Sequence, residues 1–285
     1  VSPPRRLITV PPRVDNLSAQ MRHCYVLRVF TRGDKGGNHL GVVTDVTGIS
    51  DRGMQEIAIE NNFSETVFID WREGGVPALR IFTPRRELPF AGHPLVGAAW
   101  VLGMIGPGTT DRMTCGVGEI PFRMDGDVVW VDTPMVEAVR PAPEAESIAI
   151  AAGLAEPIAA WWADMPLPYL VIDLGFAAAV ASAQPDLEAL IEHGVEMCYL
   201  IAQTKDGYKT RFFAPRDGIP EDPATGSAAS ALAAVRRHIG EGTGATTIHQ
   251  GDEVGSPSTI LLAWDERRAS IGGTVRRVEV RVLDT

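Results

Sequence analysis

Glu65 and His93 are the first residues whose types and positions could carry out acid–base chemistry. Glu65 lies in an apolar stretch, and strand alternation places it on one face with Val67 and Ile69. If that face is buried, desolvation raises the pKa of the Glu65 carboxyl group, which suits a general acid or base near neutral pH. If the face is exposed, Glu65 is an ordinary solvated side chain. His93 could hold a proton in transit or contact a substrate carboxylate, or it could merely cap a helix.

Asp222 and Ser227 form a second group of candidates. Asp222 precedes a proline in a turn, so it could act in a site or could simply form the turn. Ser227 follows Gly226 at a predicted helix start, as His93 follows Gly92. A serine in that position could bind substrate or only cap the helix, and capping alone is the more frequent outcome.

These candidates belong to a segment that occurs twice, at 80–103 and 211–235. Each copy predicts a strand, a Pro-Arg break, a turn with another proline, a glycine, and a helix of small apolar residues. Such a long-period match indicates a duplicated unit. A helix that is apolar on all sides must be buried, so each half is predicted to be a sheet rolled around one helix. The two helix starts have free N–H groups and could bind an anion in a shared cleft.

The other predicted elements surround these two units. Ser50 is a good N-cap for a helix that ends near Asn61-Asn62, and the proline-rich stretch 133–143 is the predicted connector between domains. Short helices are expected at 147–153 and 186–193. Apolar and β-branched runs predict strands at 25–30, 40–44, 64–69, 78–82, 112–115, 119–124, 128–132, 158–163, 169–172, 197–202, 208–213, 246–250, 259–264 and 274–283.

The predicted fold class is therefore α+β, with two pseudo-symmetric domains. Each domain is a rolled, mostly antiparallel sheet around a central helix. The first spans 21–132 and the second 133–285, with the last strand a candidate for crossing back to the first half. Residues 1–20 contain two Pro-Pro pairs and are interpreted as a flexible lead-in.

Composition excludes several classes of function. A formal net charge of −10 over 285 residues argues against nucleic acid and anionic membranes as partners. No apolar run is long enough to span a bilayer. The three cysteines are far apart, so a reducing, cytoplasmic setting is expected. The histidines lack metal-ligand spacing and no nucleotide-binding motif is complete, so no metal or cofactor is predicted.

Three stretches, 62–68 (NFSETVF), 90–94 (FAGHP) and 221–228 (EDPATGSA), together resemble the PhzF family of phenazine-biosynthesis isomerases. That family has the diaminopimelate epimerase-like fold, which agrees with the two-domain prediction. The resemblance implies that Glu65 is the catalytic acid/base and that His93 and Asp222 line the cleft. It also implies that the ligand-binding residues are Gly92, Gly226 and Ser227 and that the protein is a homodimer.

The resemblance also predicts the class of reaction. Related racemases of this fold carry a cysteine before the glycine at each helix start, whereas this chain has Ala91 and Thr225 there. A single carboxylate that moves a proton between two carbons is therefore expected, as in a cofactor-independent isomerase of a small unsaturated or cyclic carboxylic acid. Trans-2,3-dihydro-3-hydroxyanthranilate isomerases of the family are the model for this hypothesis. The alternatives are an epimerase or racemase of a small amino or hydroxy acid and a non-catalytic protein that binds small acids.

Two positions depart from the family pattern. His39 follows Asn38 where the family often has proline, and Ser256 stands where an arginine is expected. These departures suggest a substrate that differs from the phenazine precursor.

Overall fold

The structure, a computed structural model, describes residues 22–71, 75–105, 110–134, 136, 138–165 and 168–283. The predicted lead-in at 1–20 lies outside the described residues. Among those that are described, no helix is both long and apolar enough to cross a membrane.

The elements form two groups along the chain. The first group consists of β1 (Arg22–Val29), β2 (Asn38–Val43), α1 (Asp51–Asn61), β3 (Glu65–Asp70), β4 (Ala78–Phe82), β5 (Glu87–Leu88), α2 (Gly92–Ile105), β6 (Arg112–Cys115), β7 (Gly118–Asp125) and β8 (Val128–Thr133). The second consists of β9 (Ala138–Pro141), α3 (Ala145–Ala151), β10 (Ala159–Asp164), β11 (Tyr169–Asp173), α4 (Ala177–Ser182), α5 (Leu187–Glu192), β12 (Met197–Thr204), β13 (Gly207–Ala214), η1 (Pro215–Asp217), β14 (Ile219–Asp222), α6 (Gly226–His238), β15 (Gly244–Gln250), β16 (Ser258–Trp264) and β17 (Ala269–Leu283).

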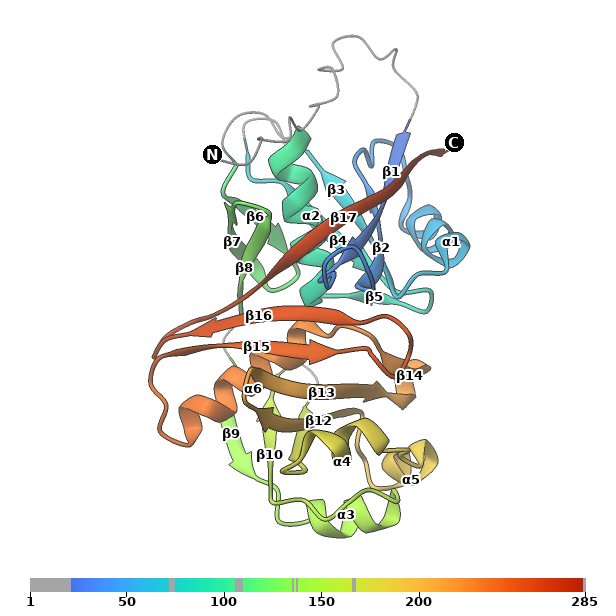
Figure 1. The fold of residues 1–285 in the computed structure, drawn as a ribbon. Helices are drawn as coiled ribbons and strands as arrows, with labels where there is room; N and C mark the ends of the chain where they lie inside the picture. The colour runs from blue at the N-terminus through green and yellow to red at the C-terminus, as the bar shows by residue number, and fades with distance from the viewer. Residues whose placement is uncertain are drawn as a thin grey trace.

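Each half is a curved, mostly antiparallel sheet rolled around one helix (Figure 1). Helix α2 packs against β1, β2, β3, β7, β8 and β17, and α6 packs against β9, β10, β11, β16 and β17. Nearly every residue from Gly92 to Leu102 is buried, as is nearly every one from Gly226 to Val235. This burial is the reason that both helices are apolar on all sides. The α+β fold class predicted from the sequence is confirmed.

Local sequence signals explain the ends of the outer helix α1. The Ser50 side chain accepts a hydrogen bond from the Gly53 N–H group at 3.1 Å, and Asn62 closes the helix in the left-handed conformation. Both interactions satisfy backbone groups that a helix end otherwise leaves unpaired. The helix that was predicted between Ser50 and Asn61 is confirmed.

Strand β17 connects the two halves. Its first residues pair with β16 of the second half and with β8 of the first. From Val275 to Leu283 it pairs with β1, with one bulge between Val26 and Leu27. The strand runs across the first half next to β1 (Figure 1). The division of the chain into 21–132 and 133–285 remains a proposal.

The two copies of the repeated segment fold alike. In the first, β4 returns through the short strand β5 into α2, and in the second, β13 returns through β14 into α6. In each copy an arginine on the first strand makes two hydrogen bonds to a glutamate on the return strand: Arg80 to Glu87 and Arg211 to Glu221. The same arginines lie over Phe82 and Phe213, two residues further on.

Five elements were not predicted: β5, β9, α4, η1 and β14. Strand β9 lies inside 133–143, the stretch interpreted only as a connector, and it pairs with β10. A proline is tolerated at the end of such a strand because one side of β9 needs no backbone donor. Helix α4 is a short alanine-rich helix with one buried large side chain, Val180, so its sequence has no clear helical period.

Candidate active site

Glu65 and His93 meet at one end of a cavity between the halves. Glu65 is the first residue of β3 and is 8% exposed, and His93 is the second residue of α2 and is 4% exposed. The Glu65 Oε2 and His93 Nε2 atoms lie 3.1 Å apart. The face that Glu65 shares with Val67 and Ile69 packs in the main core, so the alternative of a solvated face is wrong.

Burial makes both groups favour their neutral forms. It raises the pKa of Glu65 well above its usual value, and the nearby Asp222 and Asp217 carboxylates raise it further. Burial lowers the pKa of His93 to about 3, although the His39 backbone opposes the shift. If the two groups formed an ion pair, the pKa of Glu65 would be lowered and that of His93 would be raised. The two atoms therefore face each other as a neutral acid and a neutral imidazole.

Neither atom of this pair has a hydrogen-bond partner among the described residues. Among the described residues, Glu65 Oε2 and His93 Nε2 are buried and make no hydrogen bond of normal geometry. A buried polar atom without a partner costs about 1–3 kcal/mol. A ligand that offered a hydrogen-bonding group or a proton here would remove that cost.

Asp222 lies in the same region but is held by several donors. The Asn38 side chain donates to Oδ1 at 2.7 Å, the Thr225 hydroxyl donates to Oδ2, and the Ala224 N–H group also contacts the carboxylate. Burial raises the pKa of Asp222, and these hydrogen bonds oppose the shift. Asn38 also accepts a hydrogen bond from Ser64 at 3.1 Å, so it connects the two walls of the site.

Gln250 also contributes to the hydrogen bonds around Asp222. It is fully buried, and its Nε2 atom donates to the Asp222 carbonyl at 2.7 Å and to the Thr225 hydroxyl at 2.9 Å. Thr225 occupies the N-cap position of α6, yet its side chain makes no cap hydrogen bond because it donates to Asp222 instead.

Ser227 lies at the start of α6 and faces the cavity. Its hydroxyl accepts a hydrogen bond from Tyr169 at 2.9 Å, and no hydrogen bond to the backbone caps the helix. Burial raises the pKa of Tyr169 to about 12, so the phenol stays protonated and can donate. The capping alternative for Ser227 is therefore wrong.

Gly92 and Gly226 bring the two helix starts into contact. A Cβ atom on Gly92 would lie 2.7 Å from the Gly226 backbone, and one on Gly226 would lie 2.7 Å from Ile271 Cδ1 and 3.0 Å from Gly92 Cα. Only residues without a side chain allow this approach. The first-turn N–H groups of α2 and α6 consequently open on the same space, where their dipoles favour an anion.

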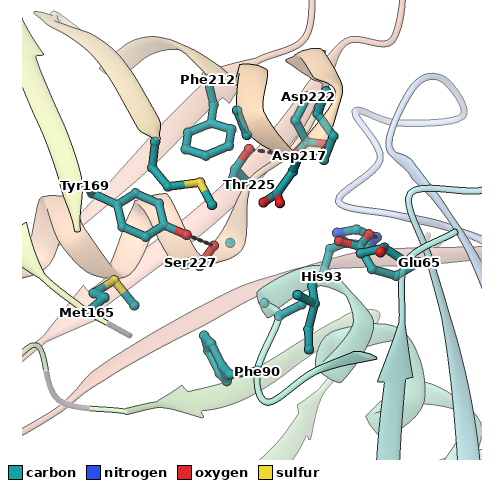
Figure 2. A pocket seen from close by; sticks show the side chains of 18 of the residues that line it. Glu65, Phe90, His93, Met165, Tyr169, Phe212, Asp217, Asp222, Thr225 and Ser227 are labelled. Carbon is teal, nitrogen blue, oxygen red and sulfur yellow. Dashed lines mark hydrogen bonds and ion pairs between the residues drawn. The ribbon is translucent and has the colours of Figure 1, made fainter. Parts of the chain in front are cut away.

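The cavity has a volume of about 240 Å³ and is lined by both halves (Figure 2). All six residues singled out as site candidates from the sequence line it: Glu65, Gly92, His93, Asp222, Gly226 and Ser227. Apolar side chains form much of the rest of the wall: Leu88, Phe90, Met165, Tyr169, Met197, Phe212 and Ile219. Such a wall suits a small ring with polar groups at one end.

Sequence reasoning missed several polar residues of the site. Asn38 follows Gly37 and Gln250 precedes Gly251, but no functional role was assigned to either residue. Tyr169 has no local signal, because it begins an ordinary buried strand. No group of three or more potential metal ligands occurs among the described residues.

The two departures from the family pattern lie outside the cavity. The His39 ring stacks on Phe63 at 5.2 Å, and Ser256 donates to the Gly37 carbonyl at 2.7 Å. Arg28 reaches Ser256 and the same carbonyl at 3.2 Å. None of these side chains lines the cavity, so the structure gives no support to a changed substrate on these grounds.

Comparisons with known proteins identify the family and the fold. Residues 27–281 match the family model described as phenazine biosynthesis-like protein (PhzC-PhzF). The trans-2,3-dihydro-3-hydroxyanthranilate isomerase of Pseudomonas aeruginosa is 32% identical over 278 residues, covering 91% of this chain and 95% of that protein. A PhzF family structure from Enterococcus faecalis has a TM-score of 0.79 at 26% identity, over 93% of this chain and 100% of the other. A probable proline racemase from Agrobacterium radiobacter has the same fold, with a TM-score of 0.60 at 10% identity over 92% and 93% of the two chains.

Proposed function

Because the chain belongs to the phenazine biosynthesis-like (PhzC-PhzF) protein family and is a PhzF-type isomerase, we propose that it isomerises a small unsaturated cyclic carboxylic acid with Glu65 as the single acid/base. The observation that carries this proposal is the buried pair of Glu65 and His93, whose facing atoms have no hydrogen bond of normal geometry within the described protein. An acid/base group that is tied up by the protein cannot exchange a proton with a substrate.

In this mechanism Glu65 first loses its proton, and the resulting carboxylate removes a proton from one ring carbon. The double bond shifts, and the same carboxyl group returns the proton to another carbon on the same face, so no atom is gained or lost. The raised pKa makes Glu65 a stronger base when ionised and keeps the resulting acid ready to donate. Neutral His93 orients the carboxyl group, and Asp222 positions a polar group of the substrate.

The helix starts bind the carboxylate of the substrate. The N–H groups at Gly92, Gly226 and Ser227 open on the cavity, where the helix dipoles favour negative charge. The three cysteines do not line the cavity, and burial raises the pKa of Cys24 and Cys198, which argues against a pair of thiolate bases.

The test is a comparison of Glu65→Gln with Glu60→Gln, which changes an exposed glutamate on α1. With trans-2,3-dihydro-3-hydroxyanthranilate as the first substrate, we expect Glu65→Gln to fold normally and to lose turnover by ~10²–10⁴-fold. The control variant should retain wild-type activity. Full activity of Glu65→Gln would refute the assignment.

A second candidate function is an epimerase that uses Glu65 and Asp222 as two bases. It is favoured by one observation: both carboxyl groups are buried in the same cavity and burial raises both pKa values. Turnover in deuterated water separates the two functions. Deuterium at the starting stereocentre with inversion supports the epimerase, whereas a moved double bond with deuterium at a different carbon supports the isomerase.

We also propose that the protein is a cytoplasmic homodimer, as the family resemblance of the sequence implies for the dimer. Its cysteines are free thiols, which fits a reducing compartment. Light scattering at micromolar concentration tests the dimer. A species of only 30.7 kDa would contradict it.

A further inference from the structure

Arg28 has a basic residue beside it on each neighbouring strand of the first half. On β1, Arg28 lies directly opposite Arg276 of β17 and directly opposite His39 of β2. Opposed residues of an antiparallel pair lie on the same face of the sheet, and like charges in this arrangement destabilise it. The row of His39, Arg28 and Arg276, called here the basic row, therefore costs stability as long as it has no counter-charge.

Neither arginine of the basic row has a counter-charge in the part of the chain that the structure describes. Arg28 Nη1 donates to two uncharged acceptors, the Gly37 carbonyl and the Ser256 hydroxyl, both at 3.2 Å. Arg276 Nη1 donates to the Asp34 carbonyl at 2.6 Å. Burial lowers the pKa of Arg28, and the charge of Arg276 lowers it further. A guanidinium group has five N–H donors, so both side chains have donors left for an anion.

The side chains next to the basic row add positive rather than negative charge. Glu279 of β17 is already paired with Arg281 at 2.6 Å. The His39 ring stacks on Phe63 at 5.2 Å, and the Arg281 guanidinium group lies over the same Phe63 ring at 5.6 Å. Burial lowers the pKa of His39, and Arg28 and Arg281 lower it further. The imidazole is therefore neutral at pH 7 and can donate one hydrogen bond.

The two positions that depart from the family pattern both belong to this region. His39 is a member of the basic row. Ser256 accepts the hydrogen bond from Arg28 and donates to the Gly37 carbonyl at 2.7 Å. Neither residue lines the catalytic cavity. The departures thus change the surroundings of Arg28 and not those of Glu65.

The basic row lies on a part of the sheet that a ligand can reach. Cys24 and Val43, further along the same face, pack with residues of α1. Arg28 and His39 are half-buried and Arg276 is exposed. An anion can therefore contact both guanidinium groups from solvent without entering the catalytic cavity. Because two of the three side chains are half-buried, water and salt screen their charges only in part.

We propose that the basic row is a binding site for the phosphate group of a small anion, separate from the catalytic cavity. A phosphate group offers several acceptor oxygens, enough for two guanidinium groups and one imidazole. It also brings more negative charge near neutral pH than a single carboxylate does. The proposal does not depend on Glu65 or on the reaction that the protein catalyses.

The opposing explanation is that Arg28 only ties β1 to the loops that contain Gly37 and Ser256. Two variants separate the explanations. Arg276→Gln removes one exposed charge and leaves those hydrogen bonds of Arg28 intact. Arg28→Gln removes the central charge but keeps a group that can donate to a carbonyl. Arg267→Gln is the matched control, because it removes one exposed charge from the turn between β16 and β17.

The experiment measures binding of inorganic phosphate to the full chain at pH 7 by calorimetry, with chloride added to hold the ionic strength constant. We expect Arg276→Gln and Arg28→Gln each to weaken phosphate binding by roughly tenfold, the ratio that one charge-assisted hydrogen bond supplies. Arg267→Gln should bind phosphate as the wild-type protein does. Phosphate bound at the helix starts of the cavity would persist in all three variants and is recognised by that.

Thermal unfolding supplies a second readout. Phosphate should raise the Tm of the wild-type protein and of Arg267→Gln more than that of the other two variants, because it stabilises only a folded state that binds it. In chloride alone, Arg276→Gln should be at least as stable as the wild-type protein, since it relieves the repulsion within the basic row.

Three results would overturn the proposal: phosphate binding of wild-type strength in Arg276→Gln and Arg28→Gln, equal weakening in Arg267→Gln, or a clear loss of stability of Arg276→Gln in chloride. If Arg28→Gln fails to fold, Arg276→Gln decides alone. No turnover is measured, so the outcome stands whether or not Glu65→Gln is active.

Discussion

The two copies of the strand–turn–helix unit share one arrangement of side chains but place it in different surroundings. In the first copy the Arg80 and Glu87 side chains are 33% and 42% exposed, and Arg80 also contacts Asp51 at the start of α1. In the second copy the corresponding pair of Arg211 and Glu221 is 8% and 10% exposed. Arg211 additionally donates to carbonyl groups at the end of α4, where the helix dipole favours a cation.

A second contrast appears where the copies meet at the cavity. In the second copy, Asp222 receives hydrogen bonds from Asn38 and Thr225 and is fixed in place. On the side of the first copy, the facing atoms of Glu65 and His93 have no hydrogen-bond partner among the described residues. One copy thus encloses its polar groups and supports the structure, while the other leaves buried polar groups free for a ligand.

Removing the glutamate from each ion pair should give the largest difference between the copies. Glu221→Gln leaves the Arg211 charge buried without its counter-ion, so we expect the free energy of unfolding to fall by about 3–5 kcal/mol. Glu87→Gln breaks a solvent-screened pair and should cost about 0–1 kcal/mol. Urea denaturation of both variants measures the difference. Equal losses would mean that the two pairs contribute alike despite their different burial.

The protonation state of His93 should give an effect of intermediate size: the stability of the wild-type protein should depend on pH more strongly than that of a variant without this histidine. Its pKa is lowered to about 3 in the folded protein, so its contribution to stability is present above the unfolded value near 6.5 and is lost as the pH falls towards 3. Between pH 7 and pH 4, the wild-type protein should therefore lose roughly 2–3 kcal/mol more than His93→Gln, which cannot titrate.

Denaturant unfolding at several pH values tests this expectation. The variant His238→Gln is the control, because His238 lies at the exposed end of α6. A constant difference between the wild-type protein and His93→Gln across this range would contradict a buried neutral imidazole.

The glycines at the two helix starts should give the smallest contrast. An alanine at position 92 would place its Cβ against the backbone of the other helix, and one at 226 would first meet the mobile end of Ile271. We expect Gly92→Ala to destabilise the protein by about 1–3 kcal/mol, and Gly226→Ala to cost less because a side chain yields more readily than a backbone. Thermal unfolding of both variants decides the order. A larger loss in Gly226→Ala would show that Ile271 cannot move.

The sequence by itself determined the features that depend on neighbouring residues. The caps of α1 at Ser50 and Asn62 follow from local hydrogen bonding, and the buried helices α2 and α6 follow from their apolar composition. The internal repeat predicted that both glycine-bearing helix starts would share one site. The family resemblance pointed to Glu65, His93 and Asp222, which do line the same cavity.

Only the tertiary structure decided which polar groups are buried and which of them have hydrogen-bond partners. Alternation tells which residues share a strand face but not which face is buried, so the surroundings of Glu65 could not be deduced from β3 alone. Asn38, Tyr169 and Gln250 reach the site from distant strands, and nothing in their local sequence marks these contacts. The contrast between Glu87 and Glu221 likewise depends on α4 covering one copy, because burial is a property of the packed chain and hydrogen-bonding capacity is a property of the residue.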